Sequence, residues 1–162
     1  RLVAAFVRGD LPLSLPKLAR ALGGPVRRAT AEELAAAVSG DLYEIRPVTP
    51  YTAADLDWSD PGARSTREMN DAASRPALAG ALPDLTAYDT VYIGFPVWWY
   101  TAPRIINTFL ESGDFTGKTI ALFATSGGSG IDGSVKDLKK QYPQLHIAGG
   151  KLLNGSVSGD IL

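Results

Sequence analysis

Short continuous apolar runs alternate with helical patterns along most of the chain. Runs of this kind are typical of strands that are buried on both faces of a parallel sheet. The pattern predicts three clear strands and two weaker ones, at residues 2–7, 90–95 and 119–124, and at residues 41–45 and 145–153. The last of these contains the pair Gly149-Gly150, which we expect to interrupt it.

Helix signals lie between these strands. Thr30 and Glu33 form a capping box, which predicts a helix over 30–38 that Ser39-Gly40 closes. A second helix is expected to begin at Pro103. Its apolar stripe consists of Ile105, Ile106, Phe109 and Leu110. Further helices are expected at residues 16–22, 63–72 and 134–141.

Strands that alternate with helices over 162 residues predict one α/β domain. We expect a doubly wound sheet of five parallel strands with helices on both faces, a three-layer α/β/α arrangement. Residues 46–84 are the least regular part. The chain ends at Leu162, where a final covering helix would begin. We therefore expect one face of the sheet to be under-covered and open to a partner, such as a second copy in a homodimer.

Composition excludes several classes of function. Cysteine is absent and histidine occurs once, so thiolate catalysis, zinc ribbons and multi-histidine metal sites are not expected. The formal net charge of −1 gives no basic field for nucleic acid. No apolar run approaches the roughly 20 residues that span a bilayer. We therefore expect a cytoplasmic protein with neither a metal site nor a membrane partner.

Candidate ligand residues follow two neighbouring strands. The carboxyl ends of parallel strands meet at one edge of a sheet, where open α/β sheets bind ligands. The first loop is aromatic and the second is rich in glycine and hydroxyl groups. The candidate residues are Pro96, Val97, Trp98, Trp99 and Tyr100 in the first loop, and Thr125, Ser126, Gly127, Gly128, Ser129 and Gly130 in the second. Either tryptophan alone could fill the core, but three adjacent aromatic side chains diverge and cannot all point inward.

These loops and their surroundings resemble the bacterial flavodoxin-like family of short, single-domain FMN proteins. The resemblance covers roughly residues 31–155. It is carried by Tyr88-Asp89-Thr90, Gly94, Pro96, Trp98-Trp99, Pro103 and Thr108-Phe109-Leu110-Glu111, and by Phe115-Thr116-Gly117-Lys118-Thr119 with Phe123-Ala124-Thr125-Ser126-Gly127-Gly128-Ser129-Gly130.

The resemblance implies a flavodoxin-like fold, an FMN cofactor and electron or hydride transfer, as in an FMN-dependent oxidoreductase with a redox partner protein. The aromatic residues 98–100 would stack on the flat flavin ring, and residues 125–130 would contact its polar edge.

The family's phosphate-binding loop after the first strand, rich in threonine and glycine, is absent here. An extra segment, residues 8–29, follows the first strand, and Pro25-Val26 stand near the expected glycine and threonine. Three alternatives follow. Arg27 and Arg28 bind the phosphate beside the helix at residue 30; or the short helix at 16–22 does so; or the chain is a flavin-free enzyme or carrier that binds another small molecule in the aromatic crevice.

A few other residues could bear on the site. Glu68 and its charged neighbours in region 46–84 would overhang the crevice, mainly as surface ion pairs. Trp58 is either a lid over the crevice or buried beneath its loop. Arg104 is a candidate for anion binding near the aromatic loop. His146, at the start of the last strand, is expected to lie at the surface far from the crevice.

Overall fold

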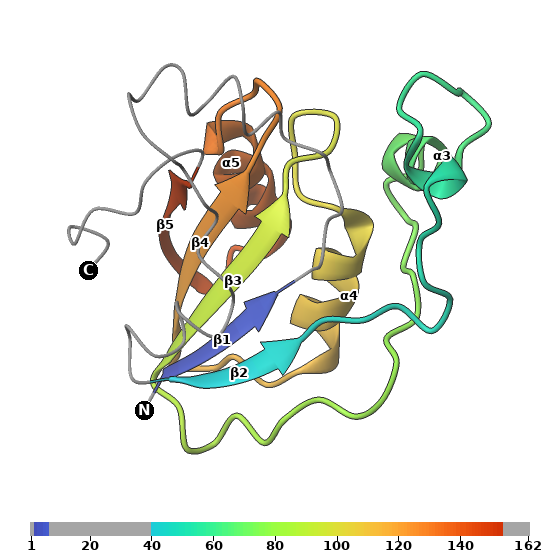
Figure 1. The fold of residues 1–162 in the computed structure, drawn as a ribbon. Coiled ribbons are helices and arrows are strands. Elements are labelled where there is room, and N and C mark those ends of the chain that lie inside the picture. Colours follow the sequence, from blue (N-terminus) through green and yellow to red (C-terminus); the bar gives the residue numbers. More distant parts are fainter. Residues whose placement is uncertain (1, 7–39, 154–162) are drawn as a thin grey trace, which may run out of the picture.

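A five-stranded parallel sheet forms the centre of the domain (Figure 1). The computed structural model describes residues 2–6 and 40–153. The sheet has the order β2-β1-β3-β4-β5, and every neighbouring pair is parallel. Its strands are β1 (Leu2–Phe6), β2 (Asp41–Glu44), β3 (Thr90–Pro96), β4 (Thr119–Thr125) and β5 (His146–Leu152). This is the doubly wound α/β fold that the alternation of patterns predicts.

Among the described residues, three α-helices and one 3-10 helix accompany the sheet: η1 (Ala54–Leu56), α3 (Arg64–Asn70), α4 (Arg104–Ser112) and α5 (Asp132–Gln141). Pro103 caps α4, as predicted. The helix expected over 63–72 ends earlier, because the Asp71 carboxylate accepts a 2.9 Å hydrogen bond from the Ala73 amide and turns the chain. The helix expected from residue 134 begins two residues earlier, at Asp132.

The core lies between the sheet and the pair α4 and α5. The predicted stripe of α4 is buried, with exposed fractions of 4% or less. Both helices cover the same face of the sheet (Figure 1). The Asn107 amide of α4 joins them, because it donates hydrogen bonds to the Gln141 side chain at 2.8 Å and to the Tyr142 hydroxyl at 3.0 Å.

The Gly149-Gly150 pair does not interrupt β5, contrary to expectation. The strand is continuous, and its register against β4 shifts by one residue between Ile120 and Ala121. Gly150 is closely packed, since a Cβ there would lie 2.8 Å from the side chains of Ile131 and Val135, which would have to shift.

The irregular region between β2 and β3 is an excursion that is closed at its base. The amide of Val48 bonds to the carbonyl of Ala77 at 2.8 Å, and that of Ala79 bonds to the carbonyl of Arg46 at 2.7 Å. The segment in between carries η1 and α3 away from the sheet (Figure 1). The guanidinium of Arg104, on α4, holds the end of α3 through its last carbonyls.

Several expectations lie outside the described residues. These are the helices at 16–22 and 30–38, the extra segment 8–29 with Arg27 and Arg28, and the covering of the second face by the end of the chain. The described residues hold the sheet and the helical layer on one of its faces.

Candidate functional site

A cavity of about 580 Å³ opens beside the carboxyl ends of β3 and β4. Three segments contribute to its wall: the loop after β3, the loop after β4 and the excursion between β2 and β3. Its lining residues are Leu56, Trp58, Ser65, Val97, Trp98, Trp99, Tyr100, Ser126, Gly127, Gly128 and Ser129. This is the edge of the sheet where doubly wound domains bind their ligands.

The loop after β3 forms a tight turn, which we call the aromatic turn (residues 98–101). Trp98 and Thr101 exchange two backbone hydrogen bonds of 2.9 Å each. The two residues between them are left-handed, with φ of 45° at Trp99 and 67° at Tyr100. Bulky residues rarely adopt this conformation, which costs on the order of 1–3 kcal/mol each. Strain of this kind clusters at functional sites.

The first turn of α5 packs closely against the aromatic turn. A Cβ placed on Gly133 would overlap the backbone carbonyl oxygen of Tyr100. Only glycine therefore allows the helix and the aromatic turn to approach each other this closely. The position of the aromatic rings depends on a residue that itself carries no side chain.

The three aromatic side chains diverge, as the sequence argument requires. Trp98 is 6% exposed, Trp99 is 37% exposed and Tyr100 is 76% exposed, and all three line the cavity. The inner indole, Trp98, packs edge-on against the ring of Tyr51, with centroids 5.2 Å apart and planes at 88°. Trp98 is therefore a buried residue that also forms part of the cavity wall. Filling the core and lining the ligand cavity, which the sequence leaves as alternatives, both apply to it.

The loop after β4 brings backbone close to the cavity. The Ser126 hydroxyl accepts hydrogen bonds from the amides of Gly128 at 3.2 Å and Ser129 at 2.8 Å, which fold the loop compactly. A Cβ added at Gly127 or Gly128 would meet no atom within 4 Å. A ligand can therefore approach this backbone closely, because nothing else of the described chain fills the space.

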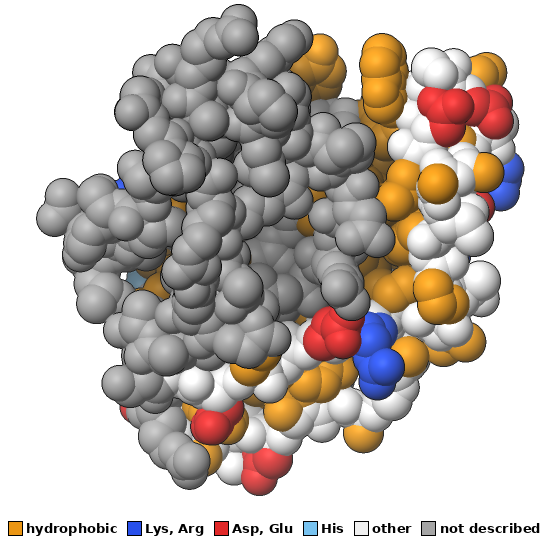
Figure 2. Space-filling view, in the orientation of Figure 1, with side chains coloured by type: hydrophobic (Ala, Val, Ile, Leu, Met, Phe, Trp, Pro, Cys, Tyr) orange, Lys and Arg blue, Asp and Glu red, His pale blue; other side chains and the backbone are white. Residues whose placement is uncertain are grey.

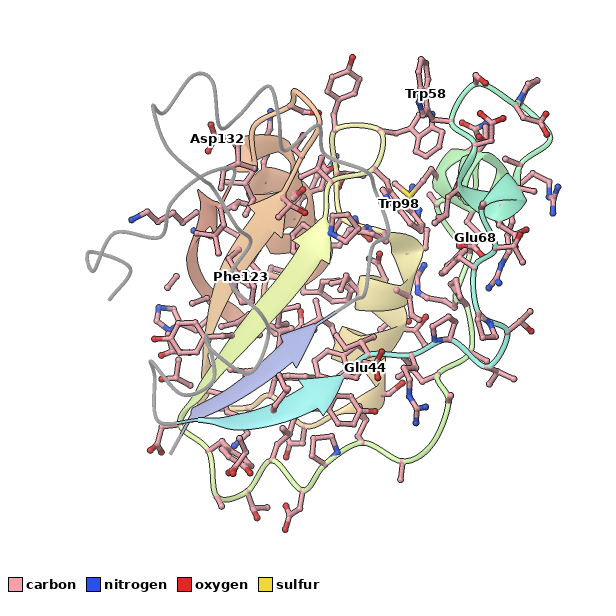
Figure 3. The ribbon with its side chains drawn as sticks, in the orientation of Figure 1. Glu44, Trp58, Glu68, Trp98, Phe123 and Asp132 are labelled. Carbon is pink, nitrogen blue, oxygen red and sulfur yellow. The ribbon has the colours of Figure 1, made fainter. Side chains whose placement is uncertain are left out.

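The excursion contributes a wall of the cavity, as expected for region 46–84, but through two residues that the sequence did not reveal. Leu56 and Ser65 line the cavity although neither was a candidate. Ser65 is 1% exposed, and its hydroxyl has no hydrogen-bond partner among the described residues. Trp58 also lines the cavity but is 76% exposed, so it stands at the rim rather than beneath its loop. In Figure 3, Trp58 lies farther out than Trp98.

A network of charged groups holds this wall against the aromatic turn. The Tyr51 hydroxyl donates a 2.5 Å hydrogen bond to Glu68, and Arg64 donates one of 2.6 Å to the other carboxylate oxygen. The Arg64 guanidinium also lies 4.2 Å from the centre of the Tyr51 ring. Burial raises the pKa of Tyr51 strongly, and the hydrogen bond to Glu68 adds to it, so the phenol stays protonated. The ion pair expected for Glu68 is present, but it is mostly buried rather than at the surface, and Glu68 does not line the cavity.

Some predicted residues lie beside the cavity rather than in its wall. Pro96 and Thr125 are paired at the ends of β3 and β4, behind the two loops. Gly130 follows the loop just before α5 and does not line the cavity. Arg104 donates to carbonyls of α3, so its guanidinium is engaged by backbone instead of facing the cavity. His146 is exposed at the start of β5, 3.3 Å from the Thr119 hydroxyl.

The described residues contain neither a membrane-spanning helix nor a cluster of metal-ligating side chains. No helix among residues 2–6 and 40–153 is long and apolar enough to cross a membrane. Over the same part of the chain, no three acidic or histidine side chains lie close enough together to hold a metal ion.

Fold and cavity together define an α/β domain with a candidate ligand cavity at the edge of a doubly wound sheet. A model of the flavodoxin family, Flavodoxin_4, matches residues 19–162, and the chain belongs to this family. No curated protein matches the chain.

Solved structures agree with this family. A Bacteroides uniformis protein assigned as a flavoprotein is 48% identical, with a TM-score of 0.82, over 97% of this chain and 92% of its own. A Bacteroides eggerthii protein with the same assignment is 45% identical, with a TM-score of 0.82, over 98% of this chain and 91% of its own. A Lactobacillus acidophilus flavoprotein in complex with FMN shares the fold at 17% identity, with a TM-score of 0.64, over 94% of this chain and 92% of its own.

Proposed function

We propose that this protein binds FMN and acts in electron or hydride transfer. The observation that carries the proposal is one cavity that joins a strained aromatic turn to a glycine-rich loop at the ligand-binding edge of the sheet. Support comes from the family and from a protein of the same fold whose structure contains FMN.

The residues present fit a flavin in size and in chemistry. The cavity of about 580 Å³ lies within the range of roughly 300–1,000 Å³ that is usual for small-molecule sites. Flat aromatic faces suit the flavin ring, and the open space at Gly127 and Gly128 lets its polar edge reach the backbone. The unpartnered Ser65 hydroxyl offers one further hydrogen bond, which would remove the cost of its burial.

Each part of the wall then has a distinct role. Trp98 and Trp99 would provide the stacking surface, and residues 126–129 would hold the polar edge of the ring. FMN itself supplies the redox chemistry. The proposed redox chemistry requires no titratable acid or base in the cavity lining. Among the described lining residues, the Tyr100 hydroxyl is the sole titratable group. The protein's contribution is to bind the ring, orient it and shield its inner face from water.

We propose that the guanidinium groups of Arg27 and Arg28 bind the phosphate of FMN. Bidentate pairs between arginine and phosphate can replace the hydroxyl contacts of the family's usual loop. An electron donor or acceptor, either a redox partner protein or a small molecule, completes the proposed function.

A reconstitution experiment tests the proposal. Purified full-length protein is mixed with excess FMN, desalted, and examined for visible flavin absorbance; quenching of flavin fluorescence gives Kd. We expect retained flavin, and a Kd that is weakened about tenfold or more in Trp99→Ala. Val48→Ala, an exposed position outside the cavity, is the control. Protein that retains no flavin, and instead carries another tightly bound small molecule, would support the flavin-free alternative.

A further inference from the structure

The cavity has a buried inner part and an exposed aromatic rim. Val97, Trp98 and Ser65 form the inner part, each 7% exposed or less. Trp58 and Tyr100 form the rim, and each keeps 76% of its surface exposed although it lines the same cavity. Large aromatic surfaces exposed together at the mouth of a cavity mark a place where a ligand binds.

The two rim aromatics come from independently held segments. Trp58 belongs to the excursion, which is fastened through its base and through Arg104. Tyr100 belongs to the aromatic turn, which is fixed by its backbone bonds and by its contact with Gly133. Because each ring stands on a separately anchored element, both rings are held in place before a ligand arrives, which limits the entropy lost on binding.

The segment that carries Trp58 has more acidic than basic side chains. Within residues 51–69 there are four acidic side chains, Asp55, Asp57, Asp60 and Glu68, and two basic ones, Arg64 and Arg67. Both basic groups are engaged, Arg64 by the Glu68 carboxylate and Arg67 by the Gly62 carbonyl. Figure 2 shows acidic and hydrophobic side chains side by side at the upper right of its face.

The acidic groups next to Trp58 stay ionised at neutral pH. Hydrogen bonds from Thr52 lower the pKa of Asp55, and hydrogen bonds from Ser59 lower that of Asp57. The described lining of the cavity carries no charged side chain. Among the described residues, an anion at the rim would therefore meet repulsion from these carboxylates and no lining cation to offset it.

We propose that the rim binds a second ligand beside the flavin, a planar aromatic molecule without negative charge that is held between Trp58 and Tyr100. The inference rests on the proposed function, because FMN takes the inner part of the cavity. It adds a substrate class: aromatic compounds that are neutral or cationic. An aromatic pair contributes about 0.5–1.5 kcal/mol beyond its buried area, and a cation gains further from the ring faces.

The test titrates three two-ring probes into full-length protein saturated with FMN. These are 2-naphthol, which is neutral, N-methylquinolinium, which is a cation, and naphthalene-2-sulfonate, which is an anion. Changes in flavin absorbance give each Kd. We expect the neutral and cationic probes to bind about tenfold more tightly than the sulfonate.

Variants at the rim assign the site. Trp58→Ala should weaken the neutral and cationic probes about tenfold, whereas Trp58→Phe, which keeps a ring, should retain most of their affinity. Asp57→Asn should strengthen the sulfonate by about threefold, because one exposed charge is removed. Val48→Ala serves as an exposed apolar control outside the cavity. Far-UV circular dichroism checks that each variant is folded.

The outcomes separate the inference from the proposed function. If wild-type protein does not bind FMN, the proposed function fails and the inference fails with it. If FMN binds but the sulfonate binds as tightly as the other probes, or Trp58→Ala leaves every probe unchanged, only the inference is overturned. A large loss of FMN affinity in Trp58→Ala would also overturn it, since Trp58 would then contact the flavin itself.

Discussion

The backbone carbonyl of Tyr100 lies in the space where a side chain on Gly133 would begin. This contact joins the aromatic turn to α5 through backbone atoms. It makes the geometry of the candidate site depend on the first turn of a helix that contributes no residue to the cavity wall.

Gly133→Ala is therefore expected to displace the aromatic turn. The added methyl group meets backbone, which cannot rotate away, so we expect a loss of about 1–3 kcal/mol in the free energy of unfolding and weaker FMN binding. Urea denaturation and an FMN titration measure the two effects. Unchanged FMN affinity would show that the aromatic turn does not depend on this contact.

Substitutions in the glycine loop should separate binding from stability. Gly127→Ala and Gly128→Ala add a methyl group to open space, so the free energy of unfolding should change by no more than about 0.5 kcal/mol. With FMN present the methyl group competes with the ligand, and Kd should rise about tenfold. Equal Kd values for wild type and both variants would place the polar edge of the ligand elsewhere.

Relief of the backbone strain at Tyr100 should stabilise the fold and weaken ligand binding at the rim. Tyr100→Gly removes the penalty of a left-handed tyrosine, and we expect the protein to gain about 1 kcal/mol of stability. The same change removes a rim ring, so the aromatic probes should bind less tightly. Thermal unfolding measures the first effect. A less stable variant would mean that packing of the Tyr100 ring outweighs the strain.

The hydrogen bond between Tyr51 and Glu68 should stabilise the wall behind Trp98. Tyr51→Phe leaves a half-buried carboxylate with one donor fewer, and we expect a loss of about 1–3 kcal/mol. Tyr43→Phe is a matched control, because the Tyr43 hydroxyl makes only a 3.4 Å contact with the Ala81 carbonyl. Urea unfolding of the two variants should differ clearly, and equal losses would contradict the assignment.

Acid should weaken the link between Arg75 and Glu111. Arg75 donates a 2.8 Å hydrogen bond to Glu111 and lowers its pKa, with a further contribution from the Tyr142 hydroxyl. A lowered pKa in the folded state adds stability above the unfolded value of 4.5, and this stability is lost as pH falls through the folded value. Glu111→Gln should flatten the loss of stability below about pH 4.5. Glu44→Gln, at a separate and more exposed pair with Arg46, is the control.

Local pattern accounts for most of the fold that could be predicted. The strand at 90–95 and the helix after Pro103 are correct to within a residue or two, because their apolar periodicity is satisfied by burial against one core. The start of α5 was misplaced because Gly133 is a poor helix former. The structure explains why glycine stands at position 133: the Tyr100 carbonyl, from a distant part of the sequence, approaches the backbone there too closely for a side chain.

The candidate site was predictable only where its residues are contiguous. The aromatic and glycine loops were visible as clusters at the ends of predicted strands. Their conformation was not, because Trp99 and Tyr100 are unfavourable residues for a left-handed turn. Ser65 gave no signal either, since a serine in an irregular region becomes notable only when folding buries its hydroxyl without a partner.

The closed base of the excursion has a consequence for how this domain can diversify. The chain leaves the sheet region near Val48 and returns to it near Ala77, so the two crossing points adjoin. A segment attached in this way can be lengthened, shortened or replaced with little disturbance to the strands that carry it. Relatives can thus retain a common sheet and differ in the wall beside it by exchanging this one segment, and a transplanted segment would be a direct means of redesign.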